Sequence, residues 1–344
     1  TGLERDKLEN EHLELQQKIA YYKDILSDEK KLLGVIKEEI LVISNKYGDE
    51  RRTQIIAAEG EIDEEDLIKE EQSVIALTHF GYIKRMPIDT YKSQKRGGKG
   101  ITGISTKEDD FVKQIFTAST HDTILFFSNK GKLYRLRGFE IPEAGRTAKG
   151  TAIVNLLSLD SGEKISTIIP IQNFAEGKYL LFATRNGNIK KTSLVEYNSA
   201  RKTGLLAINL KEDDEVIDVR LTDGEDNIVL VTRQGLAITF DEKDVRPMGR
   251  TSQGVIGIRL NKDDYVVGME SIVRGSKETL LAITENGFGK RTDLDEYRVQ
   301  TRGGKGVITY KITQKTGEIV GIRIVKEEDD IMLITDTGTI IRLN

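Results

Sequence analysis

Thr184-Arg185-Asn186-Gly187 lies between two short stretches that are rich in apolar and β-branched residues. An Asn-Gly pair in such a position is typical of the turn of a β-hairpin. The same pattern, a hydroxyl residue, two variable residues and Gly, occurs five more times: Thr78 to Gly81, Ser128 to Gly131, Thr232 to Gly235, Thr284 to Gly287 and Thr335 to Gly338. Successive glycines are 50, 56, 48, 52 and 51 residues apart, which indicates a β-rich repeat of about 50 residues.

A second motif follows each of the first five hairpins after 17 to 19 residues. A short strand pattern follows its last glycine, as at Val255 to Ile258, and another comes later, as at Val216 to Val219. The five copies end at Gly100, Gly150, Gly204, Gly254 and Gly306. Four strands per unit and six units predict a mainly β protein: a six-bladed, propeller-like ring.

Two other architectures fit a β repeat, an open solenoid and a row of separate small domains. Separate domains are disfavoured because one such unit cannot enclose a core by itself. The sixth unit reaches Asn344 without a second motif, and the first unit has none before it. The ring is therefore expected either to close with strands from both ends or to stay open.

Residues 1–48 carry helical stripes of apolar residues, Leu15 to Leu26 and Leu33 to Tyr47, with spacings of three and four. Ser27-Asp28 is expected to cap the second helix, and Gly48 to end it. The helices either pack on each other as a hairpin or form the base of a coiled-coil arm. Residues 49–72 are predicted to be an acidic linker, and 73–344 the β ring.

Composition excludes several classes of protein. The 344 residues include no cysteine and three widely spaced histidines, which argues against disulfides and a zinc site. No apolar run of 18 residues and no secretory signal are present, so a cytoplasmic protein without a membrane anchor is expected. The first residue is Thr1, which suggests a piece of a longer chain.

The charge is unevenly distributed. Residues 1–72 contain 11 Lys and Arg and 20 Asp and Glu, a net charge of −9, whereas 73–344 have a net charge of +5. Basic residues recur four positions after the hairpin glycine in five of six units, and four positions before the closing glycine of the second motif. Equivalent positions in a ring would form a basic band, which suits the non-specific binding of bent duplex DNA.

Gln94 to Gly100 is the most distinctive of these segments. Three of its seven residues are glycine, so its backbone can approach another surface closely, and Lys95, Arg96 and Lys99 add three charges. Backbone N–H groups in such a turn can also bind phosphate oxygens. No Lys-Ser or Lys-Thr pair follows the glycines, so the segment is not a nucleotide-binding Walker loop.

The heptapeptide Gln94 to Gly100 resembles the signature box in the C-terminal part of bacterial DNA gyrase A. Asp49 to Thr53, Thr120 to Gly131 and Gly145 to Gly150 resemble that protein too. The resemblance implies that residues 1–48 end the breakage-reunion domain and that 73–344 form a six-bladed β-pinwheel, whose blades exchange strands. It also implies that DNA wraps around the rim of the pinwheel, that the box is required for wrapping, and that the wrap leads to negative supercoils.

The resemblance further implies an ATP-hydrolysing type II topoisomerase that uses Mg²⁺. It acts as an A2B2 heterotetramer with gyrase B, and gyrase A self-associates through a region that precedes Thr1. No candidate for the DNA-cleaving tyrosine is present, so neither a catalytic residue nor a cofactor is expected in this segment. The alternatives are the C-terminal domain of the corresponding protein of topoisomerase IV, which usually lacks an intact box, and a propeller that serves as a protein-interaction scaffold.

The residues predicted to contact double-stranded DNA comprise the box, the basic residues near the hairpin ends and those of the second motif. They are Gln94, Lys95, Arg96, Gly97, Gly98, Lys99, Gly100, Lys84, Arg85, Arg135, Arg146, Lys149, Lys190, Lys191, Arg201, Lys202, Arg250, Lys290, Arg291, Arg302 and Lys305.

Overall fold

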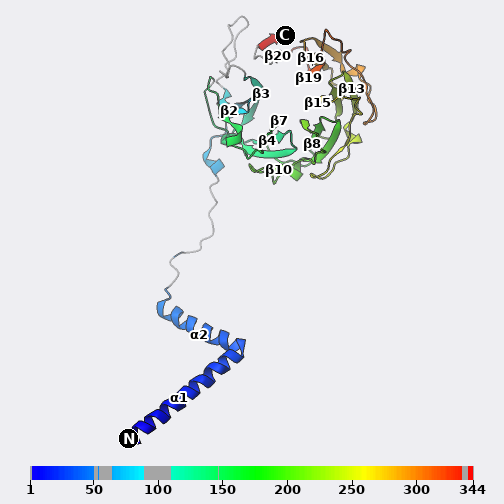
Figure 1. The fold of residues 1–344 in the computed structure, drawn as a ribbon. Coiled ribbons are helices and arrows are strands. Elements are labelled where there is room, and N and C mark those ends of the chain that lie inside the picture. The colour runs from blue at the N-terminus through cyan, green and yellow to red at the C-terminus, as the bar shows by residue number, and fades with distance from the viewer. Residues whose placement is uncertain are drawn as a thin grey trace. The chain divides into compact units, whose positions relative to one another are not determined.

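The computed structural model describes residues 2–49, 53, 64–88, 110–145, 147–334 and 340–343. The chain divides into two compact units, Thr1–Glu61 and Ile62–Asn344. The first unit contains two helices, and the second is a ring of small β-sheets (Figure 1). Neither helix, over its described residues, is long and apolar enough to cross a membrane. The predicted domain boundaries at residues 48 and 72 stay predictions.

The first unit consists of α1 (Gly2–Ser27) and α2 (Glu29–Tyr47). The Asp28 carboxylate accepts a hydrogen bond from the Lys30 N–H at 2.9 Å, which confirms its predicted role as the cap of α2. The apolar stripes are exposed, with Ile19 51% and Ile40 59% accessible. The helices therefore do not bury their stripes against each other, and their place in a coiled-coil arm stays a prediction.

The second unit repeats one antiparallel sheet. The first blade has the order β3-β1-β2-β6, with β1 (Gln72–Thr78), β2 (Tyr82–Pro87), β3 (Val112–Ser119) and β6 (Thr151–Ala152). The second blade consists of β7 (Ile165–Ile171), β4 (Thr123–Ser128), β5 (Lys132–Arg137) and β10 (Leu205–Leu206). The third consists of β11 (Val216–Thr222), β8 (Tyr179–Thr184), β9 (Asn188–Ser193) and β14 (Val255–Ile256), and the fourth of β15 (Val266–Ile272), β12 (Asn227–Thr232), β13 (Leu236–Asp241) and β18 (Val307–Ile308).

The fourth strand of each of these blades comes from the next repeat. Strand β6 follows the second hairpin in the sequence, yet it pairs with β2 of the first blade, Tyr82 opposite Ala152. This is the strand exchange that the family resemblance implies. Strands β7 and β15, which pair with the first hairpin strands β4 and β12, lie on the inner side of the ring (Figure 1). The fourth strand β10 lies on the outer side (Figure 1).

The prediction of six four-stranded blades is wrong, because the described residues form a ring of five blades. The fifth sheet has the order β17-β16-β19, with β16 (Thr279–Thr284), β17 (Gly289–Asp293) and β19 (Ile319–Val325). The sixth hairpin, β20 (Ile331–Ile334) and β21 (Ile340–Leu343), is a separate two-stranded sheet. Among the described residues it has neither a third strand nor a strand from another repeat, and two strands alone do not make a blade with its own buried faces.

The hairpin turns explain the residue pattern found in the sequence. Gly187 has a φ of +80°, a conformation that glycine adopts without strain. The Thr184 hydroxyl accepts a hydrogen bond from the Asn188 N–H at 3.2 Å, and the carboxylate of Asp214 accepts one from the Asn186 N–H at 2.9 Å. Thr78, Ser128 and Thr232 accept the same bond, so the hydroxyl residue and the glycine recur in these described turns because each of them uses both.

The hydrophobic core lies between neighbouring blades. In strand β4, Phe126 packs in a cluster with Ile75 of the first blade, whereas the adjacent Phe127 packs with Phe182 of the third blade. The central strands are therefore buried on both faces, so their sequences are continuously apolar instead of alternating. This arrangement explains why one repeat does not fold without its neighbours.

Ion pairs join the inner strands of successive blades. Arg220 on β11 lies 2.8 Å from Glu270 on β15, and Arg323 on β19 lies 3.1 Å from the same carboxylate oxygen. Arg220 also pairs with Asp218 at 3.1 Å. Burial raises the pKa of Glu270, whereas the two arginines oppose that shift. Inside the ring, cations and carboxylates thus pair across three blades.

Candidate nucleic-acid interface

The second motifs form loops next to the fourth strands, on the outer side of the ring (Figure 1). We call the four loops 145–150, 201–204, 249–254 and 301–306 the rim loops; residue 146 lies outside the described residues. Backbone N–H groups donate from each repeat to the rim loop of the next: Ser158 to the Lys202 carbonyl at 3.0 Å, Asn209 to Ser252 at 3.2 Å, and Arg259 to Gly304 at 2.8 Å. Three rim loops are therefore each held by the segment that follows the rim loop of the preceding repeat.

The closing glycine of a rim loop is dictated by close packing. Gly254 has a φ of +86°, and a Cβ atom there would lie 2.6 Å from the carbonyl oxygen of Ile189. Gly306 has a φ of +75°, and its Cβ would lie 2.3 Å from the carbonyl oxygen of Ala237. These distances are shorter than any ordinary contact, so the recurrence of glycine follows from the fit between rim loop and hairpin.

Two of the lysines that the sequence placed on the DNA surface are buried. The Lys84 ammonium is 1% exposed and donates to the carbonyls of Gly145 at 3.1 Å and Ala148 at 2.8 Å. Lys190 is fully buried and donates to the carbonyls of Ala207, at 2.8 Å, and of Arg250. Both ammonium groups are enclosed by carbonyls that include those of a rim loop, so they leave the set of proposed phosphate contacts.

Burial also changes the proton affinity of these lysines. It lowers the pKa of Lys84 and lowers that of Lys190 to about 7, where the nearby Arg250 adds to the effect and Glu196 opposes it. An ammonium with such a pKa is a poor permanent cation at neutral pH. The role that their contacts support is to hold the rim loops in place.

The basic residues four positions after the hairpin glycine reach the next repeat. Arg85 is half-buried and lies 3.5 Å from Glu71 and 3.3 Å from Glu143. Lys191 is buried, donates to the Glu242 carbonyl at 3.1 Å, and has a pKa lowered by burial. Lys191 therefore also leaves the set of proposed phosphate contacts.

Other predicted cations lie on or near the rim loops with at least part of their surface in solvent. Arg201, Lys202 and Lys305 are exposed, whereas Lys149, Arg250 and Arg302 are half-buried. The Lys149 ammonium lies 3.5 Å from the centre of the Tyr82 ring, and Lys202 lies 2.7 Å from Glu140. The Arg302 guanidinium donates to the carbonyls of Asp244 and Ile256 at 2.9 and 3.0 Å, which holds its loop against the preceding repeat.

Three predicted cations lie on the hairpins of the second and fifth blades. Arg135 is half-buried, donates to the Asn198 carbonyl at 3.2 Å, and lies 5.3 Å from the centre of the Phe174 ring. Lys290 and Arg291 are exposed, and Arg291 pairs with Glu327 at 3.0 Å. These residues lie at equivalent hairpin positions of different blades, so the structure does not gather them into one cluster.

The remaining predicted residues, Gln94 to Gly100 and Arg146, lie outside the described residues. Two exposed cations that the prediction missed, Arg246 and Arg298, precede the rim loops of the fourth and fifth repeats. Each stands eight residues before a closing glycine, and this shared offset is the signal in the sequence that could have identified them.

The charged side chains of the interface are mainly cations. No group of three or more His, Asp or Glu side chains that could hold a metal ion occurs in the described parts of the chain. Asp110, Asp214 and Asp264 are buried and accept hydrogen bonds from the N–H groups of hairpin turns. Those carboxylates serve the fold, while exposed lysines and arginines remain on linked outer loops, an arrangement suited to a polyanion.

A family model described as the DNA gyrase C-terminal domain, beta-propeller, matches residues 72–119, 122–172, 178–223, 226–272, 278–326 and 329–344. The DNA gyrase A protein of Clostridium acetobutylicum is 56% identical over 344 residues, which are 100% of this chain and 41% of that protein. The chain thus spans about two-fifths of the length of the curated relatives it matches.

Two solved structures are similar to the ring. The C-terminal domain of DNA topoisomerase IV is 33% identical with a TM-score of 0.68, and covers 80% of this chain and 84% of its own. A DNA gyrase A C-terminal domain is 30% identical with a TM-score of 0.65, and covers 79% of this chain and 89% of its own. Since the family model matches most of the chain and a DNA gyrase A protein aligns with all of it, the chain belongs to the DNA gyrase A C-terminal domain family.

Proposed function

We propose that the ring binds duplex DNA along the rim loops and bends it without reading its sequence. The observation that carries this proposal is that three rim loops are each held by a backbone hydrogen bond from the preceding repeat and present Lys and Arg at recurring positions. The proposed contacts are the box Gln94 to Gly100, Arg85, Arg135, Arg146, Lys149, Arg201, Lys202, Arg250, Lys290, Arg291, Arg302 and Lys305.

Many weak phosphate contacts suit this task better than a few strong ones. Each phosphate that a cation neutralises releases counterions, which makes affinity strongly dependent on salt. A tight bend in duplex DNA costs on the order of a few kcal/mol, so cations are needed along the whole arc of the bend. Rim loops that are fixed to one another keep these cations at constant spacing, so DNA does not have to order them.

The box Gln94 to Gly100 is proposed to be required for the wrap, on the strength of its resemblance to the signature box of gyrase A. In the sequence it ends at Gly100, the first of the five closing glycines, so it is the first repeat's counterpart of the rim loops. Gln300 to Gly306 is a near copy in the fifth repeat, with Thr301 in place of Lys95.

The whole protein is proposed to be an ATP-hydrolysing, Mg²⁺-dependent type II topoisomerase that introduces negative supercoils. The curated relatives that support this are DNA gyrase A proteins. The whole protein would pair with itself through residues before Thr1, join gyrase B as an A2B2 heterotetramer, and act on DNA in the bacterial cytoplasm and nucleoid. The present chain would contribute the wrap and leave DNA cleavage and ATP hydrolysis to other parts.

Binding and bending are tested with the 344-residue chain on duplex DNA. Gel shifts on two unrelated duplexes should give similar affinities, and ligase-mediated closure of short duplexes should be faster with the protein present. Raising the salt concentration should weaken binding steeply. If the protein binds at low salt but never accelerates closure, the bending part of the proposal is wrong.

The box is tested by replacing Gln94 to Gly100 with alanine. The thermal unfolding transition should remain, whereas the acceleration of closure should be lost. In the reconstituted holoenzyme the same replacement should remove negative supercoiling of relaxed plasmid. Loss of the unfolding transition would show that the segment serves the fold.

Topoisomerase IV is the second candidate, since a domain of that enzyme is among the similar solved structures. Gyrase is favoured because a DNA gyrase A protein aligns with the full length of this chain and because the heptapeptide box is intact. A holoenzyme that decatenates linked circles but does not supercoil relaxed plasmid would reverse this preference.

A further inference from the structure

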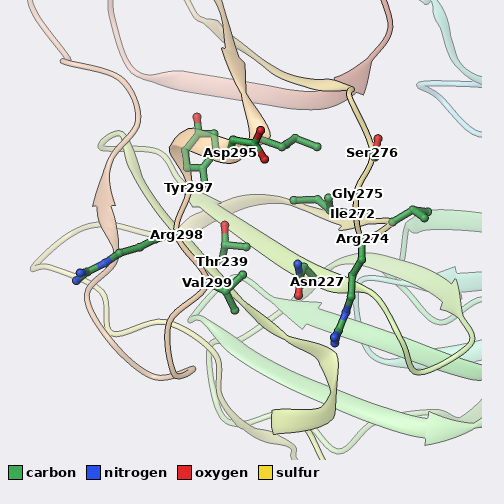
Figure 2. Close-up of a pocket in the computed structure, with 12 residues that line it drawn as sticks. Asn227, Thr239, Ile272, Arg274, Gly275, Ser276, Asp295, Tyr297, Arg298 and Val299 are labelled. Atoms are coloured by element: carbon green, nitrogen blue, oxygen red, sulfur yellow. The ribbon is translucent and has the colours of Figure 1, made fainter.

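A cavity of ≈ 260 Å³ lies between the fourth blade and the fifth repeat. Its wall includes Thr239 on β13, Asn227 on β12, and the segment from Leu294 to Val299. Figure 2 shows Thr239 in the middle of the residues that line the cavity. A water molecule occupies about 30 Å³ of the liquid, so the cavity has room for a small organic molecule.

At the position that Thr239 has in the fourth blade, each of the first three blades has a basic residue: Arg85, Arg135 or Lys191. Each of these residues stands four positions after the hairpin glycine. Each donates to a backbone carbonyl of the next repeat: Arg85 to Ile141 at 3.3 Å, Arg135 to Asn198 at 3.2 Å, and Lys191 to Glu242 at 3.1 Å.

Two of the equivalent acceptor residues in the fifth repeat can be identified, and both line the cavity. The register is fixed by parallel bridges that join Arg85 to Glu143, Lys191 to Pro247 and Thr239 to Val299. In this register Ile141 and Glu242, the acceptors for Arg85 and Lys191, correspond to Tyr297 and Leu294 of the fifth repeat. The backbone segment that accepts a cation in three blades therefore borders an open space in the fourth, because threonine is too short to fill it.

The polar group at this position lacks a partner. Thr239 is 3% exposed, and its hydroxyl oxygen makes no hydrogen bond within the described residues. A buried hydroxyl without a hydrogen bond costs on the order of 1–3 kcal/mol, so a ligand that satisfies it gains an advantage. The side chains of Asn227 and Asp295 add amide and carboxylate groups to the wall.

We propose that this cavity binds a primary alkylammonium, which takes the place that Lys191 and its counterparts fill in the other blades. Its N–H groups would donate to the backbone carbonyls of the segment Leu294 to Arg298 and to the Thr239 hydroxyl, and its carbon chain would lie along the apolar part of the wall. Binding in this cavity would not depend on DNA binding by the rim loops.

Two arginines also line the cavity, which makes an anion the rival ligand. Arg274 is already neutralised, with its guanidinium 2.6 Å from the Asp241 carboxylate. Arg298 is exposed, and its side chain extends away from Thr239 in Figure 2. Neither guanidinium is therefore placed to hold an anion against the Thr239 hydroxyl, whereas the Asn227 amide and the Asp295 carboxylate supply acceptor groups to the same wall.

The test measures thermal unfolding of the 344-residue chain with 1,4-diaminobutane, against sodium chloride at the same ionic strength. The wild-type chain should show a saturable rise of the unfolding temperature. Thr239→Lys carries its own ammonium into the cavity, as Lys191 does in the third blade, so its apparent affinity for the diamine should fall at least tenfold. Thr239→Val keeps the cavity but removes the hydroxyl, and should weaken binding less than Thr239→Lys does.

Further ligands identify the chemistry and its source. Nα-acetyl-lysine methylamide tests whether a lysine side chain of another protein fits as well as a free diamine; binding of either one supports an alkylammonium site. The proposal is overturned if inorganic phosphate raises the unfolding temperature and the amines do not. It is also overturned if neither amine raises the unfolding temperature of the wild-type chain, or if an amine that does so acts equally on Thr239→Lys.

Discussion

The inner strands and the outer rim of the ring use the same cationic side chains in different ways. On the inner strands, Arg220 and Arg323 share the carboxylate of Glu270, so the charge is neutralised between blades. On the rim, cations meet backbone carbonyls, as Arg302 does, lie in solvent, as Lys305 does, or pair with a single carboxylate, as Lys202 does with Glu140. A carbonyl satisfies a donor without cancelling its charge. A chain with a net charge of −4 can thus present positive charge where DNA is proposed to bind.

The strongest test of the comparison is the pH dependence of stability, through Lys190. Its pKa is about 7 in the folded protein, below the ordinary lysine value of 10.5, so the unfolded chain binds the proton more tightly. The stability that the folded protein has when Lys190 is neutral is complete above pH 10.5. It decreases as the pH is lowered, and it is absent below pH 7. Between pH 7 and 9.5 the free energy of unfolding should therefore rise with pH by up to about 1.4 kcal/mol per unit.

Urea denaturation across this pH range checks the prediction. Lys190→Met should make the rise less steep, because it removes one of the groups that titrate; Lys84 and Lys191, whose pKa values burial also lowers, should keep part of the rise. Lys211→Met, at an exposed lysine, is the matched control and should keep the wild-type slope. An unchanged slope in Lys190→Met would mean that the ammonium stays protonated between its carbonyl partners.

The next largest effect is expected where a rim loop meets its hairpin. Gly254→Ala should destabilise the ring by about 3 kcal/mol, since it adds strain at a positive φ and an atom 2.6 Å from the Ile189 carbonyl. Gly249→Ala in the same loop is the control, because a Cβ there meets no atom within 4 Å. Equal denaturation midpoints for the two variants would show that the loop moves to accept the extra atom.

A smaller loss is expected from the inner ion pairs. Arg220→Met leaves the largely buried Glu270 with Arg323 alone and should cost about 2 kcal/mol of unfolding free energy. Lys243→Met breaks an exposed pair with Glu225 and should cost less than about 0.5 kcal/mol. DNA affinity should be the same in both variants, and a selective loss of affinity in Arg220→Met would move the proposed interface to the inner strands.

Sequence patterns predicted the units of this fold more reliably than their number. The turns at the first five hairpin glycines, the cap at Asp28 and the strands near Val216 and Ile319 follow from local chemistry, and these are present. The hairpin motif marks only two of the four strands of a blade. Counting six hairpins therefore gave six blades, although the sixth pair of strands has no third or fourth strand in the described chain.

The sequence also did not predict in which direction some basic side chains point. Lys84 and Lys190 stand at the same offset from their hairpin glycines, and a recurring basic position of this kind suggests a surface. The strands that carry these lysines are, however, enclosed on both faces. Alternation along a strand separates core from solvent only when one face is exposed. The rim loops lack this ambiguity, because they lie outside the sheets, and three of their predicted cations are exposed.

The smallest effect on stability, and the most specific for the proposed function, is expected for exposed rim cations. Replacing Lys202 and Lys305 with alanine should leave the unfolding free energy within about 0.5 kcal/mol of the wild-type value, because neither side chain is buried. The slope of log affinity for duplex DNA against log salt should become shallower by about one for each lost phosphate contact.

Replacing Lys211 and Lys262, exposed lysines outside the rim loops, is the matched control. If both double variants lose the same slope, binding follows net charge alone. A loss confined to the rim pair would show that the linked loops, and not the ring as a whole, form the DNA path.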